Sequence, residues 1–240
     1  MSGHSKWATT KRQKAITDAK RSANFTKTAN IITIAARKGG DPDTNFSLRM
    51  AIDKAKQYNL PKDNIERAIK RGTGELGDMQ IEELIYEGFG PAKSQFIMKC
   101  LTDNKNRTAA AIRHLFAESG GSLGSVFWNF EQKGVILIDI RIINELISNL
   151  DEFELELIDQ GAEDIEKQTE GLTIYTKPGD LQKVKHFLEN KNIKTESAEV
   201  EYVAKENLTL NDEDKKRIEE FILKLEEDQD IADYYTNVIL

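Results

Sequence analysis

The stretch GVILIDI at residues 134–140 decides the class of fold. It lies where the period of the sequence has changed from helical to mixed, and it predicts a strand over residues 135–140. Five further elements follow along the chain: a helix at 151–159, strands at 163–167 and 172–176, a helix at 178–188 and a strand at 198–203. The resulting order, βαββαβ, is that of the split βαβ or ferredoxin-like arrangement.

The segments on both sides of this unit contain a second, incomplete set of elements. The sequence predicts strands at 83–86, 95–101 and 125–130, a helix at 108–116, and in the tail a helix at 212–225 and a strand at 231–235. The earlier segment lacks a helix and a strand to complete its pattern, and the tail has one of each. We therefore predict a discontinuous α/β domain of residues 78–132 plus 204–240, into which residues 133–203 are inserted as a ferredoxin-like domain.

Residues 1–77 predict a basic helical domain with a flexible N-terminal arm. Between Asp18 and Lys38 an apolar stripe recurs at helical spacing, formed by Phe25, Ala29, Ile32 and Ala36. Two shorter helices begin near Asn45 and Pro61, and such short helices need one another because each is marginal in water. The predicted fold class is therefore α+β and multidomain, with an N-terminal all-helical bundle followed by two ferredoxin-like (βαββαβ) domains, one inserted in the other.

Charge is distributed unevenly along the chain. The total is −7, but residues 1–75 hold 16 Lys and Arg against 7 Asp and Glu, a balance of +9. Residues 76–240 hold the other 18 basic and 34 acidic residues, a balance of −16. This polarity indicates a polyanion such as nucleic acid as the partner of the basic end, while a solubilising arm is the simpler alternative.

The basic N-terminal segment contains the candidate nucleic-acid-binding residues. Lys and Arg neutralise phosphates by counterion release, which requires no fixed structure before binding. His4 and Trp7 could stack on an unpaired base, or Trp7 could instead pack on its own domain. No helix presents the cluster of Arg, Asn and Gln that direct readout of the major groove requires. The candidates are His4, Lys6, Trp7, Lys11, Arg12, Lys14, Lys20, Arg21 and Lys27.

A second candidate anion site lies in TDNKNRT, residues 102–108. The segment joins a strand to a helix, and its Asp, Asn and Thr side chains can cap the first N–H groups of that helix. Lys105 and Arg107 would stand beside the same helix N-terminus, where an anion is favoured. A capped turn without a ligand and an anion site are both compatible with this pattern.

The sequence contains no zinc-binding or phosphate-loop motif. The three histidines belong to no H-E-x-x-H pattern, there is no C-x-x-C, and G-x-x-x-x-G-K-[ST] does not occur. GTGELG at 72–77 matches G-x-G-x-x-G, but it follows a helix and precedes a strand, so we interpret it as a linker. We expect no enzyme activity, no metal, no cofactor and no small-molecule substrate.

The composition favours a cytoplasmic protein. No apolar run approaches the roughly 18 residues of a transmembrane helix, and the basic N-terminus lacks the apolar region of a secretory signal. The single cysteine, Cys100, excludes an internal disulfide and is expected to be a small buried hydrophobe. We expect no membrane partner.

Several motifs, taken together and in order, resemble the YebC family. They include GHSKW, AARKGGDP, LPKDNIERAIKRGTGE, YEGFGP, LTDNKNRT, SVFWNFEQKG and AEVEYV, and they cover nearly the whole chain. The resemblance implies three domains, one helical and two ferredoxin-like. By motif match it carries over the basic positions Lys6, Lys14, Lys20, Arg21, Lys27 and Arg37. One departure is Thr28-Ala29-Asn30-Ile31, which replaces an expected Leu-Ile-Arg-Glu and removes one arginine.

The resemblance implies a function in gene expression by one of two routes. Members are described as probable transcriptional regulators that bind DNA, and we expect this chain to be one. Others, including the mitochondrial translational activator of cytochrome c oxidase, are described as acting on the ribosome to relieve stalled synthesis. The alternative is therefore a translation factor that binds ribosomal RNA or tRNA, with the acidic domains facing the ribosome or, in the first case, the transcription machinery.

Overall fold

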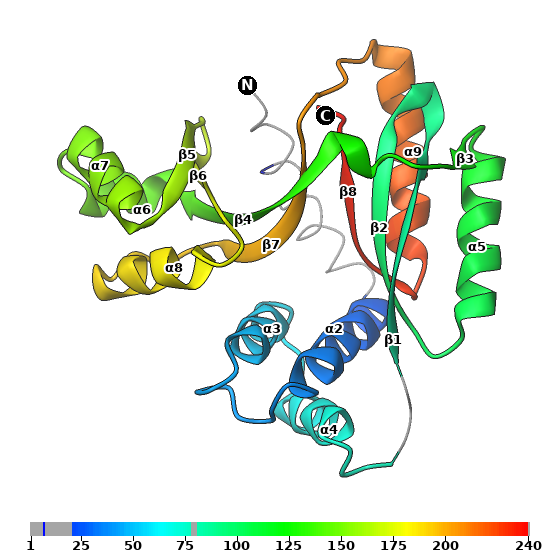
Figure 1. The fold of residues 1–240 in the computed structure, drawn as a ribbon, viewed down its shortest axis with the longest axis horizontal. Helices are drawn as coiled ribbons and strands as arrows, with labels where there is room; N and C mark the ends of the chain where they lie inside the picture. The colour runs from blue at the N-terminus through cyan, green and yellow to red at the C-terminus, as the bar shows by residue number, and fades with distance from the viewer. Residues whose placement is uncertain (1–6, 8–20, 78–80, 240) are drawn as a thin grey trace. The chain divides into compact units, whose positions relative to one another are not determined.

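The computed structural model describes Trp7, residues 21–77 and residues 81–239, with the backbone alone for residues 21–24. It is an α+β structure whose strands form two four-stranded antiparallel sheets (Figure 1). The chain divides into two compact units. Unit 1 comprises residues 1–12, 129–207 and 239–240, and unit 2 comprises residues 13–128 and 208–238.

The three helices predicted near the N-terminus are confirmed and belong to unit 2. They are α2 (Arg21–Ala36), α3 (Phe46–Gln57) and α4 (Lys62–Gly72). Their core is formed by buried Ile32, Leu48 and Ile65 with smaller residues around them. Asn45 caps α3 by accepting from the Leu48 N–H, and its amide also donates to the Ala35 and Gly39 carbonyls. One side chain thus ends α2 and begins α3, which is why the turn between them is compact.

The sheet of unit 2 has the strand order β3-β1-β2-β8. Its elements are β1 (Glu82–Phe89), β2 (Gln95–Thr102), α5 (Lys105–Glu118), β3 (Ser122–Leu123), α9 (Asp212–Glu227) and β8 (Ile231–Thr236), with a 3-10 turn η1 (Pro91–Lys93) between β1 and β2. The strand β8, from the C-terminal segment, pairs with β2. Two strands therefore precede the first helix, and the order ββαβ followed by αβ differs from the expected βαββαβ.

Aromatic side chains join the sheet of unit 2 to the helices α5 and α9. The Phe221 ring on α9 lies 5.0 Å from the Phe96 ring on β2 and 5.0 Å from the Phe116 ring on α5, edge to face in both pairs. All three are buried. A side chain at Gly88 of β1 would come within 2.7 Å of Phe116, so glycine there leaves room for the ring.

The prediction of a strand at residues 125–130 is wrong. The structure has a 3-10 turn, η2 (Phe127–Asn129), before β4 begins at Phe130. The N–H groups of Val126 and Phe127 both donate to the Glu87 carboxylate instead of to a neighbouring strand. A side-chain acceptor 39 residues away has therefore replaced the β-ladder partner that the local pattern anticipates.

The sheet of unit 1 has the strand order β5-β6-β4-β7. Its elements are β4 (Phe130–Asp139), α6 (Ile140–Leu146), α7 (Leu150–Gln160), β5 (Ala162–Lys167), β6 (Gly171–Thr176), α8 (Leu181–Asn190) and β7 (Ser197–Ala204). The strands and the two longer helices confirm the prediction. The short helix α6 is an addition, and Asp139 caps it by accepting from the Arg141 N–H at 2.8 Å.

The central strand β4 is buried on both faces, which explains its unbroken apolar sequence. A side chain at Gly134 would meet Leu181 of α8, so Ile136 and Ile138, at the same parity, face that helix. Val135 and Leu137 face the other side, where they pack with Tyr175 and Trp7. The four residues from Val135 to Ile138 are each at most 1% exposed.

Candidate nucleic-acid interface

Most of the predicted phosphate-binding residues lie outside the described part of the chain. These are His4, Lys6, Lys11, Arg12, Lys14 and Lys20, and of Arg21 the structure gives the backbone only. Trp7, Lys27, Arg37, Lys105 and Arg107 are described with their side chains. The structure separates these five into buried, internally paired and exposed groups.

Trp7 lies in a core of unit 1. The residue is 4% exposed and packs against Val135, Leu137 and Tyr175, with Val203 beside them. Among the described residues its indole Nε1 has no hydrogen-bond partner. In this conformation Trp7 therefore packs on sheet residues of unit 1 that belong to the predicted domain 133–203, and not on the helices of the predicted domain 1–77.

Lys27 is partly buried within unit 2. Its Nζ donates to the backbone carbonyl of Glu226 at 2.8 Å, in the last turn of α9, where the helix dipole favours a cation. Burial lowers the pKa of Lys27, and the neighbouring Asp228 and Asp233 oppose that shift. The ammonium is therefore already provided with an internal carbonyl and nearby carboxylates.

Residues 226–233, which we call the acidic segment, bind two further cations of unit 2. Lys54 of α3 pairs with Asp233 at 3.3 Å, and each side chain is 17% exposed. Arg107 at the start of α5 donates to both carboxylate oxygens of Asp230 at 3.1 Å. No local pattern in the sequence indicates these pairs, because the partners are 179 and 123 residues apart.

The predicted second anion site contains an anion from the protein itself. Besides binding Arg107, Asp230 accepts from the Thr108 hydroxyl at 2.7 Å. The hydrogen bond from Arg107 to Asp230 and the charge of Asp230 raise the pKa of Arg107. Asn104 caps α5 by accepting from the Arg107 N–H. The turn is thus capped as one of the two interpretations anticipated, while Lys105 is exposed.

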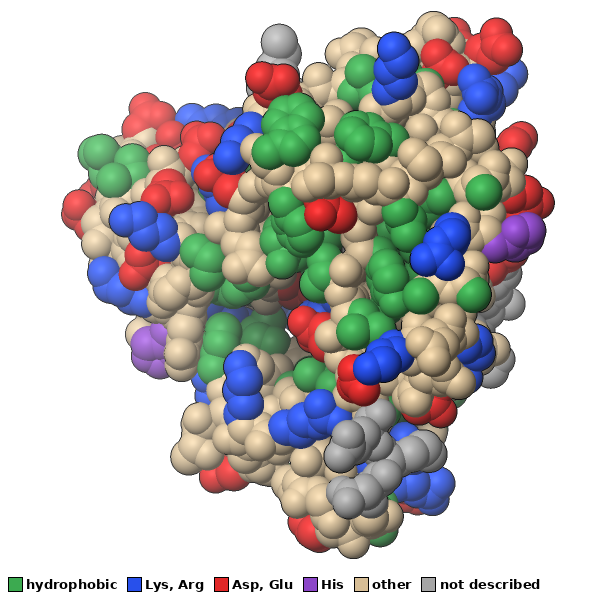
Figure 2. Space-filling view, turned by 45° about the vertical axis from the view of Figure 1, so that its right-hand side comes forward, with side chains coloured by type: hydrophobic (Ala, Val, Ile, Leu, Met, Phe, Trp, Pro, Cys, Tyr) green, Lys and Arg blue, Asp and Glu red, His purple; other side chains and the backbone are tan. Residues whose placement is uncertain are grey.

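Exposed cations remain on the helical part of unit 2. They are Arg37 and Lys38 after α2, Lys56 in the last turn of α3, and Lys62, Arg67 and Lys70 on α4. We call these six residues the exposed basic face. Figure 2 shows Lys and Arg side chains over the lower part of the molecule, where α3 and α4 lie in Figure 1. Except for Arg37, they are not among the residues predicted to bind nucleic acid, although they lie on the polar sides of predicted helices.

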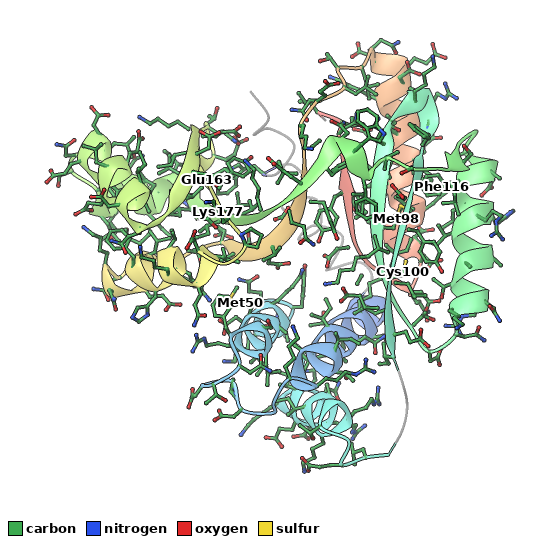
Figure 3. All side chains as sticks on the ribbon, viewed as in Figure 1. Met50, Met98, Cys100, Phe116, Glu163 and Lys177 are labelled. Carbon is green, nitrogen blue, oxygen red and sulfur yellow. The ribbon has the colours of Figure 1, made fainter. Side chains whose placement is uncertain are left out.

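The prediction that Cys100 is a small buried hydrophobe is confirmed. It lies beside Met98 on β2, on the face of the sheet from which Phe116 approaches (Figure 3). Burial raises the pKa of its thiol to about 12. In the described part of the chain, no group of three or more His, Cys, Asp or Glu side chains is placed to hold a metal ion. No helix there is long and apolar enough to cross a membrane.

Comparisons with known proteins cover the chain from end to end. The model of the TACO1/YebC protein N-terminal domain matches residues 5–75, and the model of the TACO1/YebC second and third domain matches residues 81–238. A probable transcriptional regulatory protein of Thermoanaerobacter pseudethanolicus is 48% identical, over 99% of this chain and 97% of its own length. A relative of the same description from Treponema denticola is 46% identical, over 99% and 96%.

A solved structure agrees with these matches. The crystal structure of a conserved hypothetical protein from Aquifex aeolicus superposes with a TM-score of 0.80 at 36% identity, covering 92% of this chain and 91% of the other. Likeness at this level extends to the multidomain α+β fold as well as to sequence. The chain belongs to the TACO1/YebC family.

Proposed function

We propose that this protein is a nucleic-acid-binding regulator of gene expression, and that it acts as a DNA-binding transcriptional regulator. The observation that carries the proposal is the description of relatives that match over nearly their full length, which are named probable transcriptional regulatory proteins. The charge distribution supports it independently. Residues 1–75 carry a balance of +9, whereas the remainder would be repelled by a polyanion.

We propose that binding depends on the N-terminal cations together with the exposed basic face. The cations are Lys6, Lys11, Arg12, Lys14, Lys20, Arg21 and Arg37, with His4 beside them. Lys27 already donates to the Glu226 carbonyl, and Arg107 already donates to the Asp230 carboxylate. Because part of their hydrogen-bonding capacity is used within the protein, we expect these two to contribute less than the other cations.

The finer description of the fold is part of the same proposal. We propose that residues 133–203 form a ferredoxin-like domain, which the order β5-β6-β4-β7 and the crossing helix α8 support. We also propose the division into residues 1–77, residues 78–132 plus 204–240, and residues 133–203. In this arrangement the acidic domains face protein partners in the cytoplasm, and none of the three carries out catalysis.

The test is a titration of fluorescence anisotropy against salt, with a promoter duplex, a scrambled duplex and a structured ribosomal RNA fragment. Four to six phosphate contacts should give a slope of log K against log salt of roughly −4 to −5, at about −0.9 per contact. Because few side chains can read base edges, the scrambled duplex should bind nearly as well as the promoter. Clear preference for the RNA fragment over both duplexes would contradict the DNA assignment and favour the ribosomal one.

A charge-matched pair of variants locates the contact. Alanine at Lys11, Arg12, Lys14, Lys20 and Arg21 should weaken binding sharply and reduce the salt slope, because phosphate neutralisation is lost. The control removes five exposed cations of the acidic part: Lys177, Lys183, Lys194, Lys205 and Lys216. Both variants change the net charge equally. Equal loss of binding in the two would show that net charge, and not the N-terminal segment, determines affinity.

A further inference from the structure

Trp7 occupies a face of the unit 1 sheet that its helices leave open. The sheet turns Ile136 and Ile138 toward α8, while Val135 and Leu137 look to the opposite side. There Trp7 covers Val135, Leu137 and the directly paired Tyr175. Trp7 therefore supplies apolar cover on this second side of the sheet.

The sheet has space for the indole where Gly171 lacks a side chain. A Cβ atom at Gly171, the first residue of β6, would lie 2.8 Å from Cζ2 of Trp7 and 1.9 Å from the Ile138 carbonyl oxygen. Gly171 has φ +155°, and its missing side chain leaves the space that the indole ring uses. A residue that is 4% exposed and fitted in this way is held by its surroundings.

The segment that follows Trp7 contains several of the proposed phosphate-binding cations. Residues 8–20 lead from Trp7 to the start of α2 at Arg21. Ile32 and Ala36 of α2 are buried in the helical core, and Lys27 donates to the Glu226 carbonyl. Between Trp7 and Arg21 in the sequence lie four of these cations, Lys11, Arg12, Lys14 and Lys20.

We propose that the open face of the unit 1 sheet is the docking site of the chain's own Trp7, and that the indole stays docked while nucleic acid binds. This inference rests on the proposed function. A docked Trp7 ties the start of the segment to a folded unit and removes conformational freedom before binding, so less is lost when the cations meet phosphates. Trp7 is then a positioning residue, whereas stacking on a base would require it to leave the sheet.

Intrinsic fluorescence distinguishes docking from stacking. The chain has two tryptophans, and Trp128 is 59% exposed, so the variant Trp128→Phe leaves Trp7 as the sole reporter. We expect blue-shifted emission that acrylamide quenches poorly, both in the free protein and with saturating duplex DNA. A red shift, or quenching of Trp7 by the DNA, would show that the indole leaves its site and would overturn the proposal.

Binding by Trp7→Ala supplies the second readout. Affinity for duplex DNA should fall by about tenfold, because the segment must now be ordered on binding. The slope of log K against log salt should change by less than the value of one phosphate contact, about 0.9, since the cations remain. Trp7→Phe, which keeps an apolar ring, should lie between. Unchanged affinity in a folded Trp7→Ala protein, checked by circular dichroism, would refute a positioning role.

Limited proteolysis separates failure of this inference from failure of the proposed function. Without any nucleic acid, trypsin should cleave within residues 8–20 several times faster in Trp7→Ala than in the wild-type protein, while Trp7→Phe stays close to wild type. Equal cleavage rates would overturn the docking proposal. Wild-type protein that binds no DNA or RNA at low salt would instead overturn the proposed function and leave the docking result standing.

Discussion

The two units contact the N-terminal part of the chain by different forces. In unit 2 the contacts are ionic and polar, with Lys27 on the Glu226 carbonyl and Lys54 on Asp233. In unit 1 the contact is apolar, with Trp7 on Val135, Leu137 and Tyr175. Salt and polyanions compete for ammonium groups but not for an indole. A cation near the N-terminus is therefore not automatically available to a phosphate, since the acidic segment has already bound some.

The largest expected loss of unfolding free energy comes from the apolar core of unit 2. Phe221→Ala should lower the free energy of unfolding by about 3–5 kcal/mol, because the ring bridges Phe96 and Phe116 and leaves a cavity when removed. Leu223→Ala, on the same helix at 41% exposure, should change it by no more than about 0.5 kcal/mol. Chemical denaturation measures both. Similar losses would mean that α9 does not depend on its aromatic side.

A smaller loss is expected from removing the carboxylate at the centre of the acidic segment. Asp230→Ala removes the carboxylate that accepts from the buried Thr108 hydroxyl at 2.7 Å and leaves that hydroxyl only the Asn104 carbonyl at 3.1 Å. Loss of the shorter bond should cost about 1 kcal/mol of unfolding free energy. Asp103→Ala removes only the exposed carboxylate that also touches Arg107, so its thermal midpoint should move less. If Asp103→Ala is the more damaging change, the anchoring role assigned to Asp230 is incorrect.

The ionic attachment should weaken in salt. Lys54→Met removes a partly buried pair and should lower the unfolding free energy by about 1 kcal/mol or less. The difference between the variant and the wild type should shrink as NaCl rises, because salt screens the pair only in the wild type. Lys62→Met is the control, since its pair with Glu66 is exposed. A difference that stays constant across salt would indicate apolar packing by the Lys54 stem instead.

The smallest effect is a change in pH dependence at Lys27. Because burial lowers its folded-state pKa below 10.5, the unfolded chain binds more protons between the two values, and this residue makes stability rise with pH there. Cys100 acts oppositely: its pKa rises from 9.0 to about 12, so its contribution falls above pH 9. The comparison is therefore made in a Cys100→Ala background, where Lys27→Met should remove the rise. An identical pH profile in both would contradict the shift.

Local sequence patterns were sufficient to predict elements whose hydrogen-bond partners are near in the sequence or whose two faces are both buried. The apolar run of β4, the start of α3 near Asn45 and the capped start of α5 were predicted because their causes lie within a few residues. The strand expected at 125–130 failed because Glu87, far upstream, binds its N–H groups. The helix α6 was missed because seven residues give little periodicity.

The candidate site was harder to predict than the fold for a related reason. A basic residue looks the same in sequence whether it meets solvent or a carboxylate from elsewhere in the chain. Lys27 reaches an acceptor 199 residues away, and Arg107 one 123 residues away. A tryptophan such as Trp7 can pack in an apolar core or stack on a base, and its neighbours in the sequence do not distinguish the two roles. The three-domain division and the binding role of the N-terminal cations stay predictions.

The buried thiol of Cys100 makes the protein convenient for site-specific labelling. With a pKa of about 12 and no exposure, it forms almost no reactive thiolate at neutral pH. A cysteine introduced on an exposed position of either unit can then take a maleimide dye while the native residue is left in place. Two such positions, one in each unit, would report by energy transfer on how far apart the units lie and whether DNA changes that distance.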